Sequence, residues 1–203
     1  RNKNNRKYGG MSCTDLWEVR INELKTMYKL LEDKPKVIVE LGVWEGNSTE
    51  AWAQVANKVY AIDVFITPKF RKNVLSKYNN IEVIESDSSF AANKFLDESV
   101  DMVYIDGSHE YEGVKKDILA WLPKIKINGY LTGHDFLVST SHDKMSSERV
   151  DMWDKNKNNK IIEKNGIKIA ARNEPAKAII DLIGIPDWFD VMNPPITKGA
   201  NWF

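Results

Sequence analysis

The sequence predicts an α/β fold in which a doubly wound, mostly parallel sheet carries helices on both faces. Short apolar segments alternate with amphipathic ones along residues 36–136, and strands that alternate with helices are typical of a parallel sheet. Runs such as residues 37–39 are apolar without a break, as expected for strands that are buried on both sides. The 203 residues are enough for one well-packed domain and too few for two ordinary domains.

The chain opens with a polar lead-in, residues 1–10, and a predicted helix, residues 12–34. Apolar residues recur in this helix at helical spacing, and Ser12, Thr14 and Asp15 are candidate N-caps. We therefore divide the chain into a lead-in with one helix, residues 1–35, and a main domain, residues 36–203. The sequence begins without methionine, which is typical of a domain excised from a longer protein.

The elements of the main domain follow in order. Five predicted strands are 36–42, 58–63, 81–86, 100–107 and 129–136. The helices between them are predicted at 47–57, 68–78, 90–98 and 112–125. A further helix at 174–184 and strands at 187–192 and 199–203 bring the predicted sheet to seven strands. The polar stretch 137–172 interrupts the pattern, and such a long excursion in a compact domain is typical of a lid or binding element.

Composition narrows the functional classes. Lys and Arg number 29, as do Asp and Glu, so the formal net charge is zero. This disfavours broad electrostatic binding to nucleic acid or an anionic membrane, and we expect no nucleic-acid partner. We also expect neither a membrane span nor a signal peptide. The single cysteine, Cys13, cannot form an internal disulfide, which is consistent with a reducing, cytoplasmic location.

A glycine turn joins the first predicted strand to the next helix. Gly42 and Gly46 flank this turn in VELGVWEGNST, and Asn47 and Ser48 follow as residues that favour a helix start. Backbone N–H groups at such a junction can face a polar ligand. A P-loop would end in Gly-Lys-Ser/Thr and a dinucleotide fingerprint would read G-x-G-x-x-G, and this turn has neither pattern. The structural alternative is a plain tight turn without a ligand.

Acidic residues stand at or near the ends of the first three strands. Glu40 precedes the glycine turn, Asp63 ends the second strand, and Asp87 with Ser88 follows the third. Because the carboxyl ends of parallel strands meet at one edge of the sheet, these side chains should border one ligand site. The carboxylate of Asp63 could accept hydrogen bonds from both hydroxyl groups of a ribose.

A second group of polar residues belongs to the fourth and fifth strands. Asp106 ends the fourth strand, and His134 and Asp135 lie near the end of the fifth. Two carboxylates and an imidazole that converge there could ligate a divalent cation. His109, three residues after Asp106, could accept a proton near neutral pH. The alternatives are structural: Asp106 could cap the next helix, His134 could be a buried histidine, and His109 could be solvated.

These segments resemble one known family. The run VDMVYIDGSHEYEGVKKDILAWLPKIKINGYLTGHDF, together with the glycine turn, resembles class I S-adenosylmethionine-dependent methyltransferases. Within that class it is similar to the branch of macrocin-type sugar O-methyltransferases and cephalosporin hydroxylase-like proteins. The resemblance covers roughly residues 36–136, and it implies a Rossmann-like fold and S-adenosyl-L-methionine as the cofactor.

The resemblance also implies roles for single residues. The cofactor-binding positions that it implies are Glu40, Gly42, Gly46, Asn47, Ser48, Asp63, Asp87 and Ser88. Asp106, His134 and Asp135 match positions that hold a divalent cation, Mg or Mn, although metal-dependent members have two acids where this chain has His134 and Asp135. Some relatives have a catalytic acid at the position of Ser108, and others a histidine at that of His109. Ser108 cannot act as a base unaided, so His109 is the predicted base.

The expected reaction is methyl transfer to a hydroxyl group of a sugar or glycan, with His109 as general base and a metal at Asp106. A small phenolic acceptor is the first alternative. An NAD-linked oxidoreductase, disfavoured by the glycine spacing, and a non-catalytic Rossmann-like binding module are the others. The sequence does not determine the acceptor, the hydroxyl position or the oligomeric state.

Overall fold

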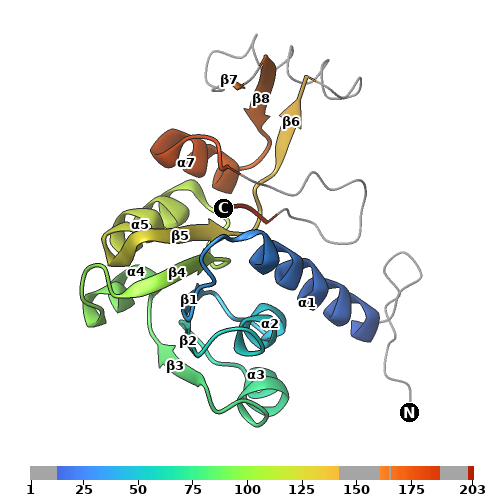
Figure 1. The fold of residues 1–203 in the computed structure, drawn as a ribbon, viewed down its shortest axis with the longest axis vertical. Helices are drawn as coiled ribbons and strands as arrows, with labels where there is room; N and C mark the ends of the chain where they lie inside the picture. Colours follow the sequence, from blue (N-terminus) through green and yellow to red (C-terminus); the bar gives the residue numbers. More distant parts are fainter. Residues whose placement is uncertain (1–12, 142–160, 165, 188–200) are drawn as a thin grey trace.

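The computed structural model describes residues 13–141, 161–164, 166–187 and 201–203. Its centre is a five-stranded parallel sheet with the strand order β3-β2-β1-β4-β5 (Figure 1). The strands are β1 (Val37–Leu41), β2 (Lys58–Asp63), β3 (Ile81–Glu85), β4 (Val100–Ile105) and β5 (Ile125–Gly133). The chain runs outward from β1 to β3 and then crosses back to β4. The direction of strand addition therefore reverses between β1 and β4, where doubly wound sheets bind their ligands.

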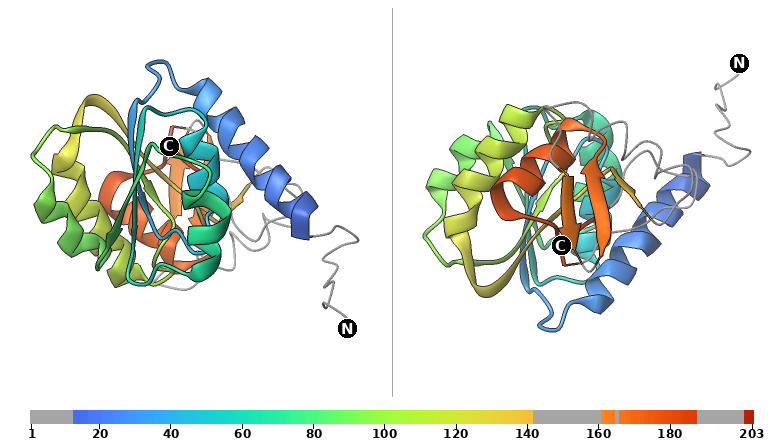
Figure 2. Two further views of the ribbon diagram at one scale, coloured as in Figure 1. Left: turned by 90° about the horizontal axis from the view of Figure 1, so that it is seen from below. Right: turned by 90° about the horizontal axis from the view of Figure 1, so that it is seen from above.

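Helices cover both faces of this sheet, as Figure 2 shows from below and above. On one face lie α1 (Cys13–Leu30), α2 (Asn47–Ala53), and α3 (Pro68–Phe70) with a π-helical turn, η1 (Arg71–Leu75). On the other face lie α4 (Ser88–Ala91) with a 3₁₀ turn, η2 (Ala92–Lys94), then α5 (Tyr111–Trp121) with a 3₁₀ turn, η3 (Leu122–Lys124), and α7 (Glu174–Ile183). The predicted α/β class with a parallel sheet is confirmed.

Alternation along the strands builds two cores. Because successive side chains of a strand point to opposite faces, Ile38 of β1 packs with α1 and α2, whereas Val39 packs with α5 and α7. In β4, Tyr104 belongs to the α1 side and Ile105 to the α5 side. The uninterrupted apolar runs in the sequence are thus strands that are buried on both faces.

Helix α1 is part of the core. Its buried stripe passes through Arg20, Leu24 and Met27 and continues to Leu31, just after the helix, whereas Leu30 is half-exposed. Trp17 ties α1 to α2 because its indole Nε1 donates to Oε2 of Glu50 at 2.7 Å. The stripe thus carries one charged residue, Arg20, toward the interior of the protein.

Several predicted elements differ from the observed ones. The predicted helix 68–78 is a short α3 that widens into η1, and the predicted helix 90–98 is α4 with η2 and no more. The fifth strand begins at Ile125 and ends at Gly133, so His134 and Asp135 follow the strand. Asn128 breaks the regular pattern with φ of 64°, where the sequence suggested a loop before the strand.

The predicted seven-stranded sheet is not confirmed. In the part of the chain that the structure describes, three later strands form a separate antiparallel sheet with the order β6-β8-β7. These are β6 (Val138–Thr140), β7 (Ile161–Lys164) and β8 (Ile167–Ala171). They pair locally because Gly166, with φ of 78°, supplies a left-handed turn position between β7 and β8. The predicted excursion 137–172 is therefore structured at both ends, and its role as a lid stays a prediction.

The C-terminal segment, residues 201–203, pairs with the main sheet through one backbone bridge. Trp202 forms an antiparallel bridge with Gly133, and each backbone N–H donates to the other's carbonyl. Of the predicted strand 199–203, residues 201–203 are described, and they form this bridge through Trp202. Nearly all of the predicted strand 187–192 lies outside the described residues. Among the helices of the described ranges, none is long and apolar enough to cross a membrane.

Candidate active site

A cavity of about 730 Å³ opens at the carboxyl ends of the parallel strands. It lies over the β1–β4 junction and is bordered by the segments that follow β1, β2, β3, β4 and β5. The predicted site residues that line it are Gly42, Asn47, Ser48, Asp63, Asp87, Ser88, Asp106, His109, His134 and Asp135. The topology thus brings together residues from five separate segments, while Glu40 and Gly46 lie outside the lining.

The glycine turn after β1 depends on two left-handed residues. Gly42 has φ of 85°, and a Cβ at this position would lie 2.4 Å from the carbonyl oxygen of Asp106. Gly46 has φ of 97°, and its Cβ would meet the side chains of Val74 and Phe70. The glycines therefore let the turn lie against β4 on one side and against η1 on the other. Gly46 serves packing beneath the cavity.

Trp44 lies between the two glycines and is 72% exposed at the cavity. Its φ of 42° is unusual for a bulky residue. The turn is held in place because its backbone N–H donates to Asp63, and its carbonyl accepts from the hydroxyl of Thr67 at 3.1 Å. A strained residue that its neighbours fix at a cavity edge is typical of a functional site.

Glu40 is completely buried below this turn. Its Oε2 accepts from the hydroxyl of Thr49 at 2.5 Å, and its Oε1 has no hydrogen-bond partner among the described residues. Burial raises the pKa of Glu40 to about 8, although the hydroxyls of Ser48 and Thr49 oppose the rise. The carboxyl group therefore carries a proton at neutral pH, and it reaches α2 from below the cavity. Its predicted role toward the cofactor stays untested.

Asp63 has two relations to the cavity. It lines the cavity, and its Oδ2 accepts from the backbone N–H of Val43 at 2.9 Å and of Trp44 at 3.2 Å. Its Oδ1 accepts from the N–H of Phe65 at 3.2 Å. The side chain that was predicted to bind a ribose thus also ties the end of β2 to the glycine turn, a contact that the sequence did not reveal.

The two predicted residues after β3 point different ways. Asp87 caps α4, and the hydrogen bonds from Ser89 and from the N–H of Phe90 lower the pKa of its carboxyl. The hydroxyl of Ser88 donates to Oδ1 of Asp117 in α5 at 2.5 Å. Burial raises the pKa of Asp117 to about 6 despite this hydrogen bond. Ser88 therefore links the cavity wall to a buried carboxyl group.

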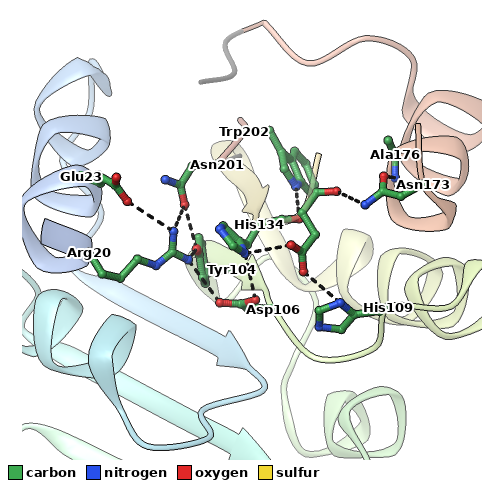
Figure 3. Close-up of polar contacts among 11 residues, drawn as sticks. Arg20, Glu23, Tyr104, Asp106, His109, His134, Asn173, Ala176, Asn201 and Trp202 are labelled. Carbon is green, nitrogen blue, oxygen red and sulfur yellow. Dashed lines mark hydrogen bonds and ion pairs between the residues drawn. The ribbon is translucent and has the colours of Figure 1, made fainter. Parts of the chain in front are cut away.

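Asp106, His134 and Asp135 converge at the ends of β4 and β5, and Figure 3 shows Asp106 and His134 there side by side. Nδ1 of His134 lies 3.5 Å from Oδ1 of Asp106 and 3.2 Å from Oδ1 of Asp135. Burial would lower the pKa of His134, but the hydrogen bonds to the two carboxylates outweigh it and raise the pKa above its ordinary value. Burial would likewise raise the pKa of Asp135, but the same interaction with His134 lowers it.

This cluster fits a divalent cation in its geometry. One donor atom from each of Asp106, His134 and Asp135 lies within 4.8 Å of the other two, a span that one metal ion with bonds of about 2.0–2.3 Å can bridge. The donor set contains one nitrogen, and imidazole suits Mn²⁺ better than the oxygen-preferring Mg²⁺.

Asp135 is shared between two histidines. Its Oδ2 lies 3.3 Å from Nδ1 of His109, whose side chain is 71% exposed, while its Oδ1 faces His134. The backbone of Asp135 is left-handed, with φ of 61°, and its carbonyl accepts from Asn173 Nδ2 at 2.8 Å and from the N–H of Leu137 at 2.9 Å. The hydrogen bonds from Asn173 and Leu137 fix Asp135 in the position from which its carboxylate reaches both imidazoles.

Sequence reasoning missed a set of supporting residues. Arg20 lines the cavity from α1 and lies 3.3 Å from Oδ2 of Asp106. Tyr104 and Asn201 contact its guanidinium group, and Trp202 donates from Nε1 to the carbonyl of His134 at 3.2 Å (Figure 3). The one available signal was an arginine at helical spacing from Leu24, on the face that the apolar stripe buries.

A methyltransferase family is similar to the part of the chain that builds the sheet and the cavity. Residues 39–136, just under half of the chain, match the model of a methyltransferase domain family. The matched segment contains nearly all of the parallel sheet from β1 to β5 and the glycine turn after β1 described above. A search among curated proteins found no match.

Solved structures share this fold at low sequence identity. Phosphoethanolamine N-methyltransferase 1 of Haemonchus contortus is 19% identical with a TM-score of 0.50, over 61% of this chain and 26% of that chain. The YcgJ protein of Bacillus subtilis is 16% identical with a TM-score of 0.50, over 66% of this chain and 58% of that chain. CalS11, a TDP-rhamnose 3′-O-methyltransferase of calicheamicin biosynthesis, is 13% identical with a TM-score of 0.53, over 97% and 80%.

These similarities confirm the fold and leave the acceptor open. The chain spans about a quarter of the length of the first of these proteins and under two thirds of the second. The similar proteins include an N-methyltransferase and an O-methyltransferase. The expectation that nucleic acid is not a partner gains no support from the comparisons and stays a prediction.

Proposed function

We propose that this protein transfers a methyl group from S-adenosylmethionine to a hydroxyl group of a sugar or glycan, with His109 as the general base. The observation that carries the proposal is the pair of His109 and Asp135, 3.3 Å apart at one end of the cavity. The other end of the same cavity is built by the glycine turn and Asp63. The proposed base and the features expected of a cofactor site thus line the same cavity.

The end of the cavity that contains the glycine turn and Asp63 would bind and orient the cofactor. S-adenosylmethionine supplies an activated methyl group when it is bound. Asp63 would accept hydrogen bonds from the ribose hydroxyls with its remaining lone pairs, because its present partners are three backbone N–H groups. Gly42 lines the cavity, and the absence of a side chain at this position lets the glycine turn lie against Asp106 and Gly107.

At the end of the cavity that contains His109 and Asp135, the proton of the acceptor hydroxyl would be removed. Oδ2 of Asp135 can accept the Nδ1–H of His109, which leaves Nε2 unprotonated and able to take the proton of an acceptor hydroxyl. A hydroxyl oxygen is a poor nucleophile while it keeps its proton, so removal of that proton during transfer contributes roughly 10²–10⁴-fold. Asp135 fixes the ring and balances the positive charge that His109 then carries.

A divalent cation is the second part of the proposal. Asp106, His134 and Asp135 would hold it, and the cation would lower the pKa of a hydroxyl that it binds. Arg20 already occupies Oδ2 of Asp106, which leaves Oδ1 for this purpose.

The choice of a hydroxyl acceptor rests on the need for a base. A neutral amine has a free electron pair and can attack without first losing a proton. A hydroxyl becomes a better nucleophile when a base removes its proton. The fold similarity to a TDP-rhamnose 3′-O-methyltransferase agrees with a sugar acceptor. Trp44, exposed at the cavity, could stack on a sugar face. It would stack on a phenolic ring as well, so a phenolic acceptor is an outcome of the test.

The test is an acceptor screen with the intact chain and S-adenosylmethionine, with mass spectrometry to detect one added methyl group. The panel contains nucleotide sugars, oligosaccharides, catechols, amines and RNA, each with and without EDTA. We expect transfer to a sugar hydroxyl and a loss with EDTA that Mn²⁺ reverses. Transfer only to an amine or to RNA would contradict the hydroxyl assignment, and full activity in EDTA would remove the cation from the proposal.

A further inference from the structure

The guanidinium group of Arg20 is buried at the edge of the candidate active site. Its side chain is only 9% exposed, although the residue lies on the first helix, far in sequence from every predicted site residue. Nη2 lies 3.3 Å from Oδ2 of Asp106 and also contacts the hydroxyl of Tyr104. Nη1 donates to Oδ1 of Asn201 at 2.8 Å and lies 4.0 Å from Oε2 of Glu23. Figure 3 shows these groups around the guanidinium.

The partners of Arg20 outside its own helix come from two parts of the fold. Tyr104 and Asp106 stand at the end of β4, and Asn201 belongs to the C-terminal segment that bridges β5 through Trp202. The hydroxyl of Tyr104 donates to Oδ1 of Asn201 at 2.9 Å, so Arg20, Tyr104 and Asn201 contact one another. Asn201 and Trp202 are both buried. The C-terminal segment is therefore built into the same network as Asp106.

The surroundings of Arg20 differ from those of an arginine that binds an anionic ligand. Its two terminal nitrogens already face four oxygen-bearing groups. A guanidinium that recognises a ligand usually presents its two-pronged edge to that ligand. Here that edge is directed at groups of the protein.

Fold stability alone is a poor explanation for Arg20. Moving an ion pair out of water is costly, and apolar residues of similar volume often serve a buried position as well or better. The neighbouring positions on the same stripe, Leu24 and Met27, are apolar in this way. A charge at position 20 is therefore better explained by what it does to Asp106 than by what it adds to the core.

The position of Arg20 relative to Asp106 suggests its effect. It binds Oδ2 of Asp106, while Oδ1 faces Nδ1 of His134 at 3.5 Å. The carboxylate is thus held from two sides, and its rotation about the Cβ–Cγ bond would break one contact or the other. His134 in turn faces Asp135, which contacts His109. A displacement of Asp106 would reach the predicted base through three contacts, by way of His134 and Asp135.

We infer that Arg20 is a positioning residue of the active site, which holds Asp106 in the orientation that faces His134, and that Asn201 holds Arg20 in turn. This inference rests on the proposed function for its kinetic consequence. Its structural part, the control of Asp106 and His134 by Arg20, does not depend on which acceptor is methylated.

The kinetic test compares Arg20→Met with Arg71→Met. Arg71 is a matched control because it also pairs with a carboxylate, Glu85 at 3.4 Å, but lies exposed and away from the cavity. Arg20→Met should lower kcat by roughly 100-fold, as misplaced groups do, with the S-adenosylmethionine Kd unchanged. Arg71→Met should keep the activity of the unmodified protein. An equal loss of kcat and of cofactor affinity in Arg20→Met would indicate a general structural role and overturn the inference.

Two further variants sharpen the kinetic test. Arg20→Lys keeps the charge but cannot reach Asn201 and Asp106 together, so it should recover only part of the lost kcat. In the background of Asp106→Asn, the change Arg20→Met should cause little further loss, because its effect passes through Asp106. Losses that multiply fully in the double variant would contradict the inference.

A spectroscopic test covers the case in which Arg20→Met folds poorly or the acceptor is unknown. The chain has three histidines, so NMR of histidine-labelled protein gives few imidazole signals, and His134→Gln assigns the one of interest. Asn201→Leu, which leaves Arg20 in place, should shift the His134 signal, as should Arg20→Met, and Arg71→Met should not. A His134 signal that neither variant moves would overturn the inference. Failure of the acceptor screen with these shifts present would count against the proposed function alone.

Discussion

The carboxylate of Asp135 lies 3.3 Å from Nδ1 of His109 at the edge of the cavity. This pair turns an exposed histidine into an oriented one, because the carboxylate favours the tautomer with the proton on Nδ1. Under the proposed function, the remaining nitrogen would be available to an acceptor in the cavity.

His109→Ala should therefore lose most turnover and keep cofactor binding. We expect kcat to fall by roughly 10²–10⁴-fold, the usual contribution of a general base, and the Kd of S-adenosylmethionine, measured by calorimetry, to stay the same. Glu110→Ala is a suitable control because Glu110 is the exposed neighbour of His109. Unchanged turnover in His109→Ala would remove the base assignment.

Asp63→Ala should weaken cofactor binding. The substitution removes the predicted ribose contact and also the acceptor that holds the N–H groups of Val43 and Trp44. We expect the Kd of S-adenosylmethionine to rise by about tenfold or more, which corresponds to about 1.4 kcal/mol. Glu85→Ala is the matched control, because Glu85 ends the neighbouring strand β3 outside the cavity lining. Equal affinities for the two variants would contradict the role of Asp63.

Gly42→Ala should damage both the fold and the site. The new Cβ would lie 2.4 Å from the carbonyl oxygen of Asp106 and 2.5 Å from the Cα of Gly107, so the end of β4 must move. Gly166→Ala provides the control, since Gly166 also has a positive φ but no heavy atom within 4 Å of the added Cβ. That control should cost only the backbone strain, about 1–2 kcal/mol, in denaturant unfolding.

The outcome for Gly42→Ala separates two explanations. A loss of stability clearly larger than that of Gly166→Ala, accompanied by lower cofactor affinity, would support close packing of the turn against Asp106. Equal losses in both variants would mean that strain at a left-handed position accounts for the whole effect.

Asp117→Asn should change how stability depends on pH. Burial raises the pKa of Asp117 from 3.8 to about 6, so the folded protein binds this proton more tightly than the unfolded chain does. The stabilisation is complete below pH 3.8 and is lost as the pH rises through 6. The difference between these two pKa values corresponds to a fall of about 3 kcal/mol at most in the free energy of unfolding. The variant Asp117→Asn should not show this fall.

The measurement for Asp117 is urea unfolding between pH 4 and pH 7. Asp97→Asn removes an exposed carboxylate that pairs with Lys124 at 2.6 Å, and it should keep the pH dependence of the unmodified protein. If Asp117→Asn shows the same slope as that control, the proton on Asp117 does not contribute.

Much of the site could be predicted because it depends on local patterns at strand ends. In a parallel sheet all carboxyl ends meet at one edge, so residues such as Asp63, Asp106 and Asp135 converge whatever the details of the helices. The convergence of Asp106, His134 and Asp135 agrees with that expectation. Glu40 was predicted for the same reason, but the pleat turns its side chain below the cavity, since neighbouring strand residues face opposite sides.

The later part of the sheet could not be predicted in the same way. Strands β7 and β8 pair antiparallel, and β8 pairs with β6 in a separate sheet. Such antiparallel pairing depends on which edge is accessible, and short polar strands carry a weak periodic signal. The bridge between Trp202 and Gly133 joins positions about 70 residues apart, and no local pattern indicates it.

The sequence by itself determined the α/β class, the order of the main elements, the glycine turn and the acidic strand ends, because each is encoded in a short run of neighbouring residues. Only the tertiary structure decided that Arg20 of the first helix and Asn201 near the last residue meet at Asp106. It also decided that Asp135 serves two imidazoles. Such contacts depend on how distant elements pack. A buried charge needs a group that neutralises it, and only the tertiary structure shows which group that is.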